Sequence, residues 1–101
     1  MKTKQFVQVD LDQDGYLVYI DEWSVHFVEQ YAEKEGIKEL KADHWKLIAA
    51  IRFAYEKSGV SPLCRDILND TGFTKQEVYA LFPHGHRSAY KLAGLPKPPE
   101  C

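Results

Sequence analysis

Hydrophobic positions along the chain change from alternating spacing near the N-terminus to helical spacing afterwards. Residues 4–9 and 16–20 are rich in β-branched and aromatic side chains, and in the first run they alternate weakly with polar ones. An Asp-Gly pair at 14–15 separates the two runs, which is a common signal for a hairpin turn. The pattern predicts an N-terminal β-hairpin over residues 4–20, which must pack on the rest of the protein because a lone hairpin is marginally stable.

Helices are predicted over most of the remaining chain, residues 21–93. The first runs from about residue 21 to Glu35 and is ended by Gly36. The second begins near Asp43 and ends near Ser58; it is apolar on most sides, so we expect it to be the central helix. Two more helices and a short fifth one are predicted from capping residues and prolines, with starts at Ser61-Pro62, Thr74 and Arg87.

The last eight residues, 94–101, predict an extended arm. Three of the four positions from 96 to 99 are proline, which prevents a helix and favours a polyproline-like conformation. Such an arm reaches roughly 20 Å at about 3.1 Å per residue. Cys101 is its last residue, so the arm carries a thiol that can enter another protein's active site. An incidental cysteine on a fraying tail is the alternative, and position alone leaves both open.

Composition limits the class of protein. A chain of 101 residues with 45% hydrophobic and 28% charged side chains predicts one folded domain over 1–101. The longest apolar run, 47–51, is too short to span a membrane, and no secretion signal follows Met1. We therefore expect a cytoplasmic protein with no membrane contact. Two cysteines, Cys64 and Cys101, exclude a disulfide scaffold.

Charge is unevenly distributed along the chain. Residues 1–45 carry a net charge of −5 and residues 46–101 a net charge of +3, for a total of −2. The acidic half argues against broad electrostatic binding to nucleic acid, whereas the basic half leaves room for a local anionic partner.

Residues 10–21 follow the oxygen spacing of an EF-hand calcium loop, with Gly15 at the turn position. The last carboxylate is Asp21 in place of the usual glutamate, and the residues before Asp10 are not helical. A hairpin turn with solvated acidic side chains is the preferred interpretation, and no metal or other cofactor is assigned.

Residues 61–83 have the pattern of a helix-turn-helix, in which the second helix carries Lys75, Gln76 and Tyr79. That helix has only one basic residue, so a DNA-binding regulator is kept as an alternative of another class and no direct nucleic-acid partner is expected. His84 and His86 lack the partners of a zinc site, and we expect them to be solvated. With Arg87, Lys91 and Lys97 they add positive charge beside the arm, which favours a thiolate there.

Cys64 lies among the apolar residues of its predicted helix and is expected to be a buried packing residue. No Ser-His-Asp arrangement, glycine-rich phosphate loop or zinc signature is present in the sequence. A self-sufficient enzyme is therefore not expected.

The C-terminal motif resembles the DsrC/TusE family. It consists of Leu-Phe-Pro at 81–83, Gly85, the run 89–98 ending in Gly-Leu-Pro-Lys-Pro, and Cys101. The resemblance continues upstream in family order, at residues 15–17, Trp23, 35–37, His44-Trp45, Ser61-Pro62 and Arg65. It covers nearly the whole chain.

The resemblance implies a sulfur carrier whose arm cysteine accepts sulfur as a persulfide and transfers it. TusE-type members act in the relay that supplies sulfur for 2-thiouridine in tRNA, and DsrC-type members work with dissimilatory sulfite reductase. Two-cysteine members carry a second arm cysteine where this chain has Tyr90, so the arm disulfide of those members cannot form here. The loop at 71–77 is also shorter than is usual in the family, and that loop helps to distinguish partners.

These observations together predict a mostly α protein: a small orthogonal helical bundle with a helix-turn-helix-like segment, an N-terminal β-hairpin and a mobile C-terminal arm. The predicted function is a TusE-like sulfur carrier that accepts persulfide sulfur on Cys101 and acts with a donor and an acceptor protein. A DsrC-like partner of dissimilatory sulfite reductase is the alternative. Candidates for steadying the thiolate or docking a partner are Arg87, Lys91, Gly94, Leu95, Pro96, Lys97 and Pro98.

Overall fold

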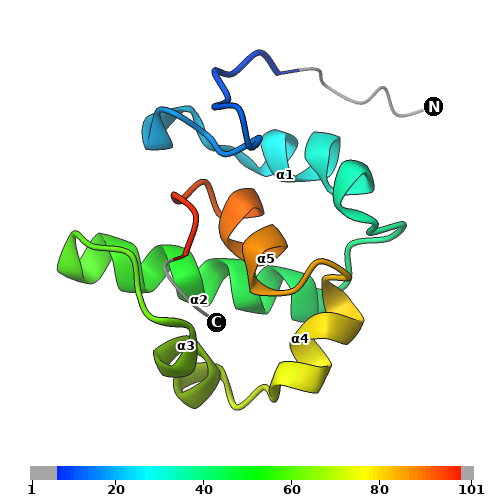
Figure 1. The fold of residues 1–101 in the computed structure, drawn as a ribbon, viewed down its shortest axis with the longest axis vertical. Helices are drawn as coiled ribbons and strands as arrows, with labels where there is room; N and C mark the ends of the chain where they lie inside the picture. The colour runs from blue at the N-terminus through cyan, green and yellow to red at the C-terminus, as the bar shows by residue number, and fades with distance from the viewer. Residues whose placement is uncertain (1–6, 99–101) are drawn as a thin grey trace.

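The computed structural model describes residues 7–98 of the chain, and within them the fold is built from helices (Figure 1). α5 lies between α1 and α2, and α3 packs against α2. The α-helices are α1 (Val25–Tyr31), α2 (Ala42–Ser58), α3 (Cys64–Thr71), α4 (Lys75–Leu81) and α5 (His86–Leu92), and two short 3-10 helices are η1 (Ile20–Glu22) and η2 (Glu33–Glu35). The predicted mostly helical class is confirmed.

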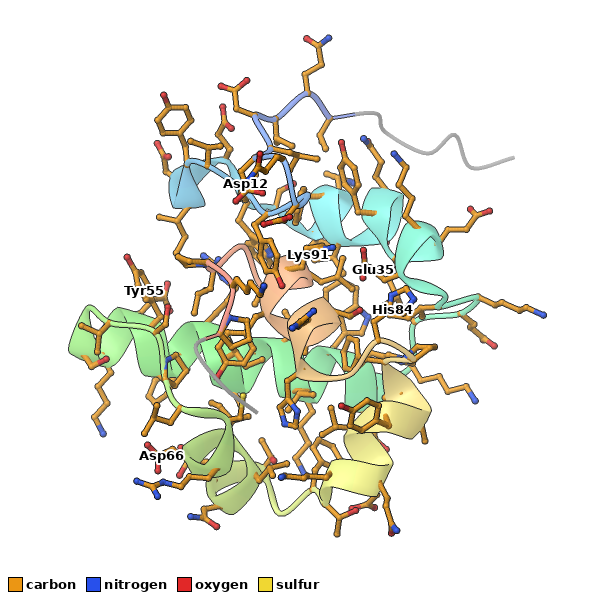
Figure 2. All side chains as sticks on the ribbon, in the orientation of Figure 1. Asp12, Glu35, Tyr55, Asp66, His84 and Lys91 are labelled. Carbon is orange, nitrogen blue, oxygen red and sulfur yellow. The ribbon has the colours of Figure 1, made fainter. Side chains whose placement is uncertain are left out.

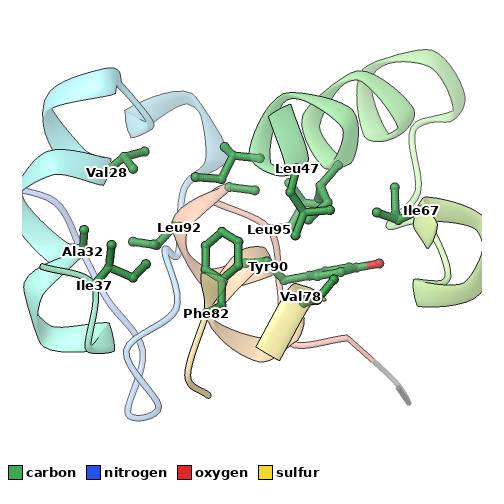
Figure 3. Packing of buried hydrophobic residues seen from close by; sticks show 14 of the residues in the cluster. Val28, Ala32, Ile37, Leu47, Ile67, Val78, Phe82, Tyr90, Leu92 and Leu95 are labelled. Atoms are coloured by element: carbon green, nitrogen blue, oxygen red, sulfur yellow. The ribbon is translucent and has the colours of Figure 1, made fainter. Parts of the chain in front are cut away.

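One hydrophobic core is shared by all five α-helices. Leu47, Ile48 and Ile51 of α2 are at most 1% exposed, so one face of this longest helix lines the core. α5 contributes Tyr90 and Leu92, each 0% exposed, and Figure 3 shows both among the packed side chains. Because α5 is buried on most sides, the chain that follows it starts from inside the core.

The predicted N-terminal β-hairpin is wrong. Within residues 7–98 the only ladder pairing is an isolated bridge between Leu11 and Leu17, and no strand forms. The carboxylate of Asp12 accepts hydrogen bonds from the backbone N–H groups of Asp14 and Tyr16, at 2.9 Å each, and backbone bonds from Asp12 N–H to Tyr16 C=O and from Gly15 N–H to Asp12 C=O close the same turn. The chain enters η1 soon afterwards, which leaves too few residues to extend the pairing.

Val7, which precedes the turn, bonds to α1 instead. The backbone N–H and C=O of Val7 pair with the side-chain amide of Gln30, at 2.7 and 3.1 Å. The Gln30 side chain therefore uses the backbone hydrogen-bonding groups of Val7 that a neighbouring strand would otherwise use. The first residues of the predicted hairpin, 4–6, lie outside the described residues.

The single helix predicted over 21–35 is divided into η1, α1 and η2. The break lies at Trp23, whose backbone is extended with ψ 142°, and Ser24 rather than Asp21 caps α1 by accepting a hydrogen bond from Phe27 N–H. The extended backbone allows the Trp23 indole to contact α5, as described below. Gly36 ends η2 with φ 82°, as predicted.

The later helix limits are closer to prediction. Thr74 caps α4 through a reciprocal pair of hydrogen bonds with Glu77, at 2.9 and 3.1 Å, and α5 begins one residue before Arg87. α3 begins at Cys64, not at Ser61-Pro62. A three-residue turn joins α3 to α4, so the helix-turn-helix-like order of elements is present. No helix in residues 7–98 is long and apolar enough to cross a membrane.

Candidate functional site at the base of the C-terminal arm

Three hydrogen bonds hold the chain where α5 ends and the arm begins, a segment of residues 92–95 that we call the arm base. Trp23 Nε1 donates to the carbonyl of Leu92 at 2.7 Å, and Arg52 Nη1 donates to the carbonyl of Ala93 at 2.8 Å. The Leu95 N–H donates to the carbonyl of Tyr90 at 3.1 Å. Carbonyls at the end of a helix lack helical partners, and here side chains from distant elements satisfy two of them.

Arg52 and Trp23 also contact each other. The guanidinium carbon of Arg52 lies 3.9 Å from the centroid of the Trp23 ring, which is a cation–π arrangement. Burial lowers the pKa of Arg52, against the opposing effect of Glu56. The stacking holds the Arg52 and Trp23 side chains where they donate to the carbonyls at the end of α5. The arm base is therefore held in one position.

Gly94 permits this close packing. Its φ is 82°, in the left-handed region, and a Cβ added there would lie 2.9 Å from Trp23 Cδ1. Any other residue would be strained in its backbone and would push against the indole. The glycine of the Gly-Leu-Pro-Lys-Pro motif is therefore required by the contact with Trp23.

The described part of the arm leaves from inside the core. Leu95 is 0% exposed and belongs to the buried cluster, Pro96 and Lys97 are exposed, and Pro98 is buried. Gly94 and Leu95 thus serve as an anchor on the helical body. Cys101, the predicted sulfur-bearing residue, lies outside the described residues.

Tyr90 links the arm base to the start of α3. Its side chain is fully buried, and its hydroxyl donates a hydrogen bond to the carbonyl of Pro62 at 2.6 Å. Burial raises the pKa of Tyr90 to about 12, with a smaller contribution from Asp66. Tyr90 is therefore a buried structural side chain.

Glu35 forms a polar cluster that the sequence did not reveal. Its carboxylate accepts a hydrogen bond from Ser88 Oγ at 2.6 Å and lies 3.3 Å from both His84 Nδ1 and Lys91 Nζ (Figure 2). Burial raises the pKa of Glu35, but the hydrogen bonds from Ser88 and His84 and the charge of Lys91 outweigh it, so the pKa is lowered overall. The cluster links η2 to α5. The sequence pattern had indicated only that Glu35 lies at the end of a helix.

The basic candidates near the arm divide into two kinds. Lys91 is partly buried and has partners within the protein: its ammonium pairs with Glu35 and lies 5.1 Å from the centroid of the Tyr16 ring. Arg87 and Lys97 are exposed. Because Arg87 and Lys97 face solvent, their charges remain open to an external anion or partner, whereas the charge of Lys91 is paired with Glu35.

The two histidines of the 84–87 segment differ in environment. His84 has a 61% exposed side chain, which matches the expectation of a solvated residue. The same expectation is wrong for His86, which is 3% exposed and whose Nε2 has no hydrogen-bond partner. Burial, with the charge of Lys75, lowers the pKa of His86. In residues 7–98 no group of three or more metal-ligating side chains comes together.

Cys64 occupies the first position of α3, where it is 4% exposed and part of the hydrophobic core. Its predicted burial is confirmed. The structure also has Cys64 in the disulfide-bonded state, which the sequence did not predict. Cys64 is therefore more than a small apolar side chain that fills space between α3 and α2.

Within residues 7–98, a small helical body with an anchored arm base defines the structural class of this protein. The chain belongs to the DsrC-like family, because the family model "DsrC like protein" matches residues 3–101.

Relatives with assigned names fall into two groups. The chain is 43% identical over 101 residues to "Sulfite reductase, dissimilatory-type subunit gamma" of Nitratidesulfovibrio vulgaris, which covers 99% of this chain and 93% of the relative. It is 34% identical to "Sulfurtransferase TusE" of Buchnera aphidicola, with 95% and 90% covered.

Solved structures agree with this assignment. A chain in a crystal structure of dissimilatory sulfite reductase I matches with a TM-score of 0.85 and 39% identity over 92% of this chain and 90% of that one. The oxidized gamma-subunit of the dissimilatory sulfite reductase (DsrC) from Archaeoglobus fulgidus matches with a TM-score of 0.80 and 34% identity, covering 92% and 91%. The resemblance seen in the sequence motifs is confirmed.

Proposed function

We propose that this protein is a sulfur carrier that accepts a persulfide sulfur on Cys101 and delivers it to an acceptor enzyme, in the manner of the TusE sulfurtransferases. The observation that carries the proposal is the anchored arm base. Trp23, Arg52 and Tyr90 hold residues 92–95 against the body, while the sequence beyond Leu95 continues into a proline-rich segment that ends in a thiol. A fixed base and an extended arm allow a thiol to enter a partner's site while the body stays outside.

The transfer chemistry needs a thiolate and access rather than an enclosed pocket. The Cys101 thiolate attacks the outer sulfur of a donor persulfide, the donor leaves as a thiolate, and Cys101 holds the sulfur as its own persulfide. An acceptor then takes that outer sulfur by the same displacement. The exposed cations Arg87 and Lys97 are the residues we assign to thiolate stabilisation or partner docking.

The experiment is persulfide loading followed by intact mass. The reduced wild-type protein, incubated with a sulfane-sulfur donor, is expected to gain one sulfur atom, and reduced Cys101→Ala is expected to gain none. Cys64→Ala is the matched control and should load like the wild type. An adduct that persists in Cys101→Ala would reject Cys101 as the carrier residue.

A second candidate function is a partner role in dissimilatory sulfite reduction. Its support is the 43% identity with a gamma subunit of dissimilatory sulfite reductase, compared with 34% for the TusE relative above. Binding to a dissimilatory sulfite reductase lacking its own gamma subunit tests it: saturable binding favours this candidate, and no binding favours the TusE-like one. A DNA-binding role has no comparable support, because α4 contains one basic residue, Lys75.

A further inference from the structure

A groove between α2 and α3 gathers exposed apolar side chains. It has a volume of about 560 Å³ and lies where α2 ends and α3 begins, at one edge of the body in Figure 1. Three of the side chains that line it are large, hydrophobic and strongly exposed: Phe53 at 65%, Val60 at 64% and Leu63 at 42%. Apolar side chains that cluster in a concave part of the surface are typical of an interaction site.

The wall that α3 contributes to this groove carries two carboxylates whose charges the chain leaves uncompensated. Asp66 and Asp70 are four positions apart, so they lie on one face of α3, and like charges at this spacing destabilise a helix. Asp70 is also in the last turn of α3, where the helix dipole disfavours a negative charge and no basic residue is present. Among residues 7–98 neither carboxylate forms an ion pair.

Lys57 is the cation that lines the opposite wall. It lies in the last turn of α2, where a positive charge is favourable to the helix, and it forms no ion pair with Asp66 or Asp70. The charged side chains of the groove therefore sum to −1, and the negative charge is concentrated on the α3 wall. An occupant that complements this groove has an apolar part and a positive charge that faces α3.

We propose that this groove binds a segment of a partner protein in which an apolar side chain lies about one helical turn from a lysine or arginine. The apolar side chain covers Phe53, Val60 and Leu63, and the cation lies against Asp66 and Asp70. This inference deepens the proposed function and rests on it in one respect, namely that the partner is a protein that exchanges sulfur with this carrier.

Tyr90 connects the groove to the arm base. Pro62 lines the groove, and its carbonyl accepts the hydrogen bond of the Tyr90 hydroxyl at 2.6 Å. The Tyr90 carbonyl accepts the N–H of Leu95 at 3.1 Å. Because the Tyr90 side chain is fully buried, it fixes the loop at Pro62 relative to the arm base. A partner that binds in the groove is therefore held at a set position relative to the start of the arm.

A second copy of this chain is the less favoured occupant. In a two-fold symmetric dimer built on this groove, identical surfaces face each other. The carboxylates of Asp66 and Asp70 would then meet the same carboxylates of the second copy rather than a cation. Charge complementarity thus favours a different protein.

Selection from a random, cysteine-free peptide library displayed on phage tests which chemistry the groove prefers. The whole reduced protein is the target. The inference predicts enriched peptides that combine an apolar side chain with a lysine or arginine about three or four positions away. The Kd of an enriched peptide is then measured by fluorescence anisotropy with the wild type and with variants that circular dichroism shows to be folded.

Phe53→Ala should raise this Kd about tenfold or more, since it removes a large apolar contact. Asp70→Asn should raise it about two- to fivefold, the effect of losing one exposed ion pair. Tyr19→Ala and Asp21→Asn are the matched controls, because they make similar changes at exposed positions outside the groove, and they should leave the Kd unchanged.

Asp70→Asn also separates binding from stability. It removes the repulsion with Asp66 and a negative charge at the end of α3, so the melting temperature of the free protein should stay the same or rise while binding weakens. A fall in the melting temperature would show that the Asp70 carboxylate serves the fold, and would overturn its assignment to a partner.

The remaining outcomes are equally decisive. Enriched peptides that are acidic, a Kd that Phe53→Ala leaves unchanged, or no enrichment at all overturns the inference. A dimer in sedimentation that Phe53→Ala dissociates also overturns it, because the groove would then bind a second copy. The selection uses no sulfur donor, so its result is independent of persulfide loading. Peptide binding supports the inference even where loading fails, and normal loading does not rescue it where no peptide binds.

Discussion

The Arg52 guanidinium stacks on the Trp23 ring at 3.9 Å, and both side chains donate hydrogen bonds to consecutive carbonyls at the end of α5. Two elements far from the arm in sequence thereby fix where the arm begins. The stacked pair therefore fixes the position of the carbonyls after which the proline-rich segment starts.

Replacing Arg52 by alanine is expected to loosen the arm base, because it removes both the stacking and the bond to Ala93. The free energy of unfolding should fall by about 1–3 kcal/mol. Hydrogen exchange at the Leu95 amide should become faster by more than the fall in the free energy of global unfolding explains. Arg65→Ala, at an exposed arginine of α3, is the matched control and should change stability by less than about 0.5 kcal/mol. Equal effects of the two substitutions would contradict the anchoring role.

Gly94→Ala should be more costly than Gly59→Ala. The two glycines have similar φ values, 82° and 79°, so the left-handed backbone penalty of about 1–2 kcal/mol is shared. An added Cβ meets Trp23 at 2.9 Å in the first case and nothing within 4 Å in the second. The difference between their chemical-denaturation midpoints therefore isolates the contact with Trp23, and a difference of zero would show that the indole moves freely.

Glu35→Gln should destabilise the protein at neutral pH by about 1–3 kcal/mol, because it removes a carboxylate that binds Ser88, His84 and Lys91. The folded pKa of Glu35 lies below the ordinary glutamate value of 4.5. Its contribution is therefore fully present above that value and is lost as the pH falls through the folded pKa.

Urea titrations at several pH values measure this effect. The stability difference between the wild type and Glu35→Gln should be constant near neutrality and should shrink below about pH 4.5. Glu33→Gln, at an exposed glutamate in the same short helix, provides the control. A difference that grows on acidification would contradict the assignment.

Tyr90→Phe should cost about 1–2 kcal/mol, because it leaves the Pro62 carbonyl without its buried donor. The pKa of Tyr90 is raised from 10.0 to about 12 in the folded protein. Its contribution is thus complete below pH 10 and is lost as the pH rises toward 12. Alkaline unfolding followed by circular dichroism should show this loss in the wild type and in a Tyr19→Phe control, but less in Tyr90→Phe. The same alkaline midpoint in all three proteins would count against the Tyr90 bond.

Sequence patterns predicted the helical body well because its signals are local. Thr74 with Glu77, and the glycines after α2 and η2, mark helix limits by backbone chemistry that needs no tertiary contact. The N-terminal hairpin failed because a side chain of α1, Gln30, bonds to Val7 in place of a strand. That competition depends on residues that are distant in sequence.

The candidate site was predicted only in part. The arm and Cys101 were visible from proline spacing and from the family motif, whereas the anchoring pair and the Glu35 cluster were not. Arg52 and Trp23 are separated by 29 positions, and Glu35 and Ser88 by 53, so no local pattern joins them. Lys91 was predicted to add positive charge beside the arm, and its pairing with Glu35 shows that charge alone does not reveal which cations remain available.

Localising the carried sulfur tests the central claim most directly. The reduced protein is incubated with a sulfane-sulfur donor, rapidly alkylated and digested with trypsin. Cleavage after Lys57, Arg65 and Lys91 places the two cysteines in separate peptides, 58–65 and 92–101. Cys64→Ala is measured in parallel as the matched control. The account predicts one added sulfur atom on peptide 92–101, at Cys101, in both proteins. Added sulfur on peptide 58–65 alone, or on neither peptide, would contradict it.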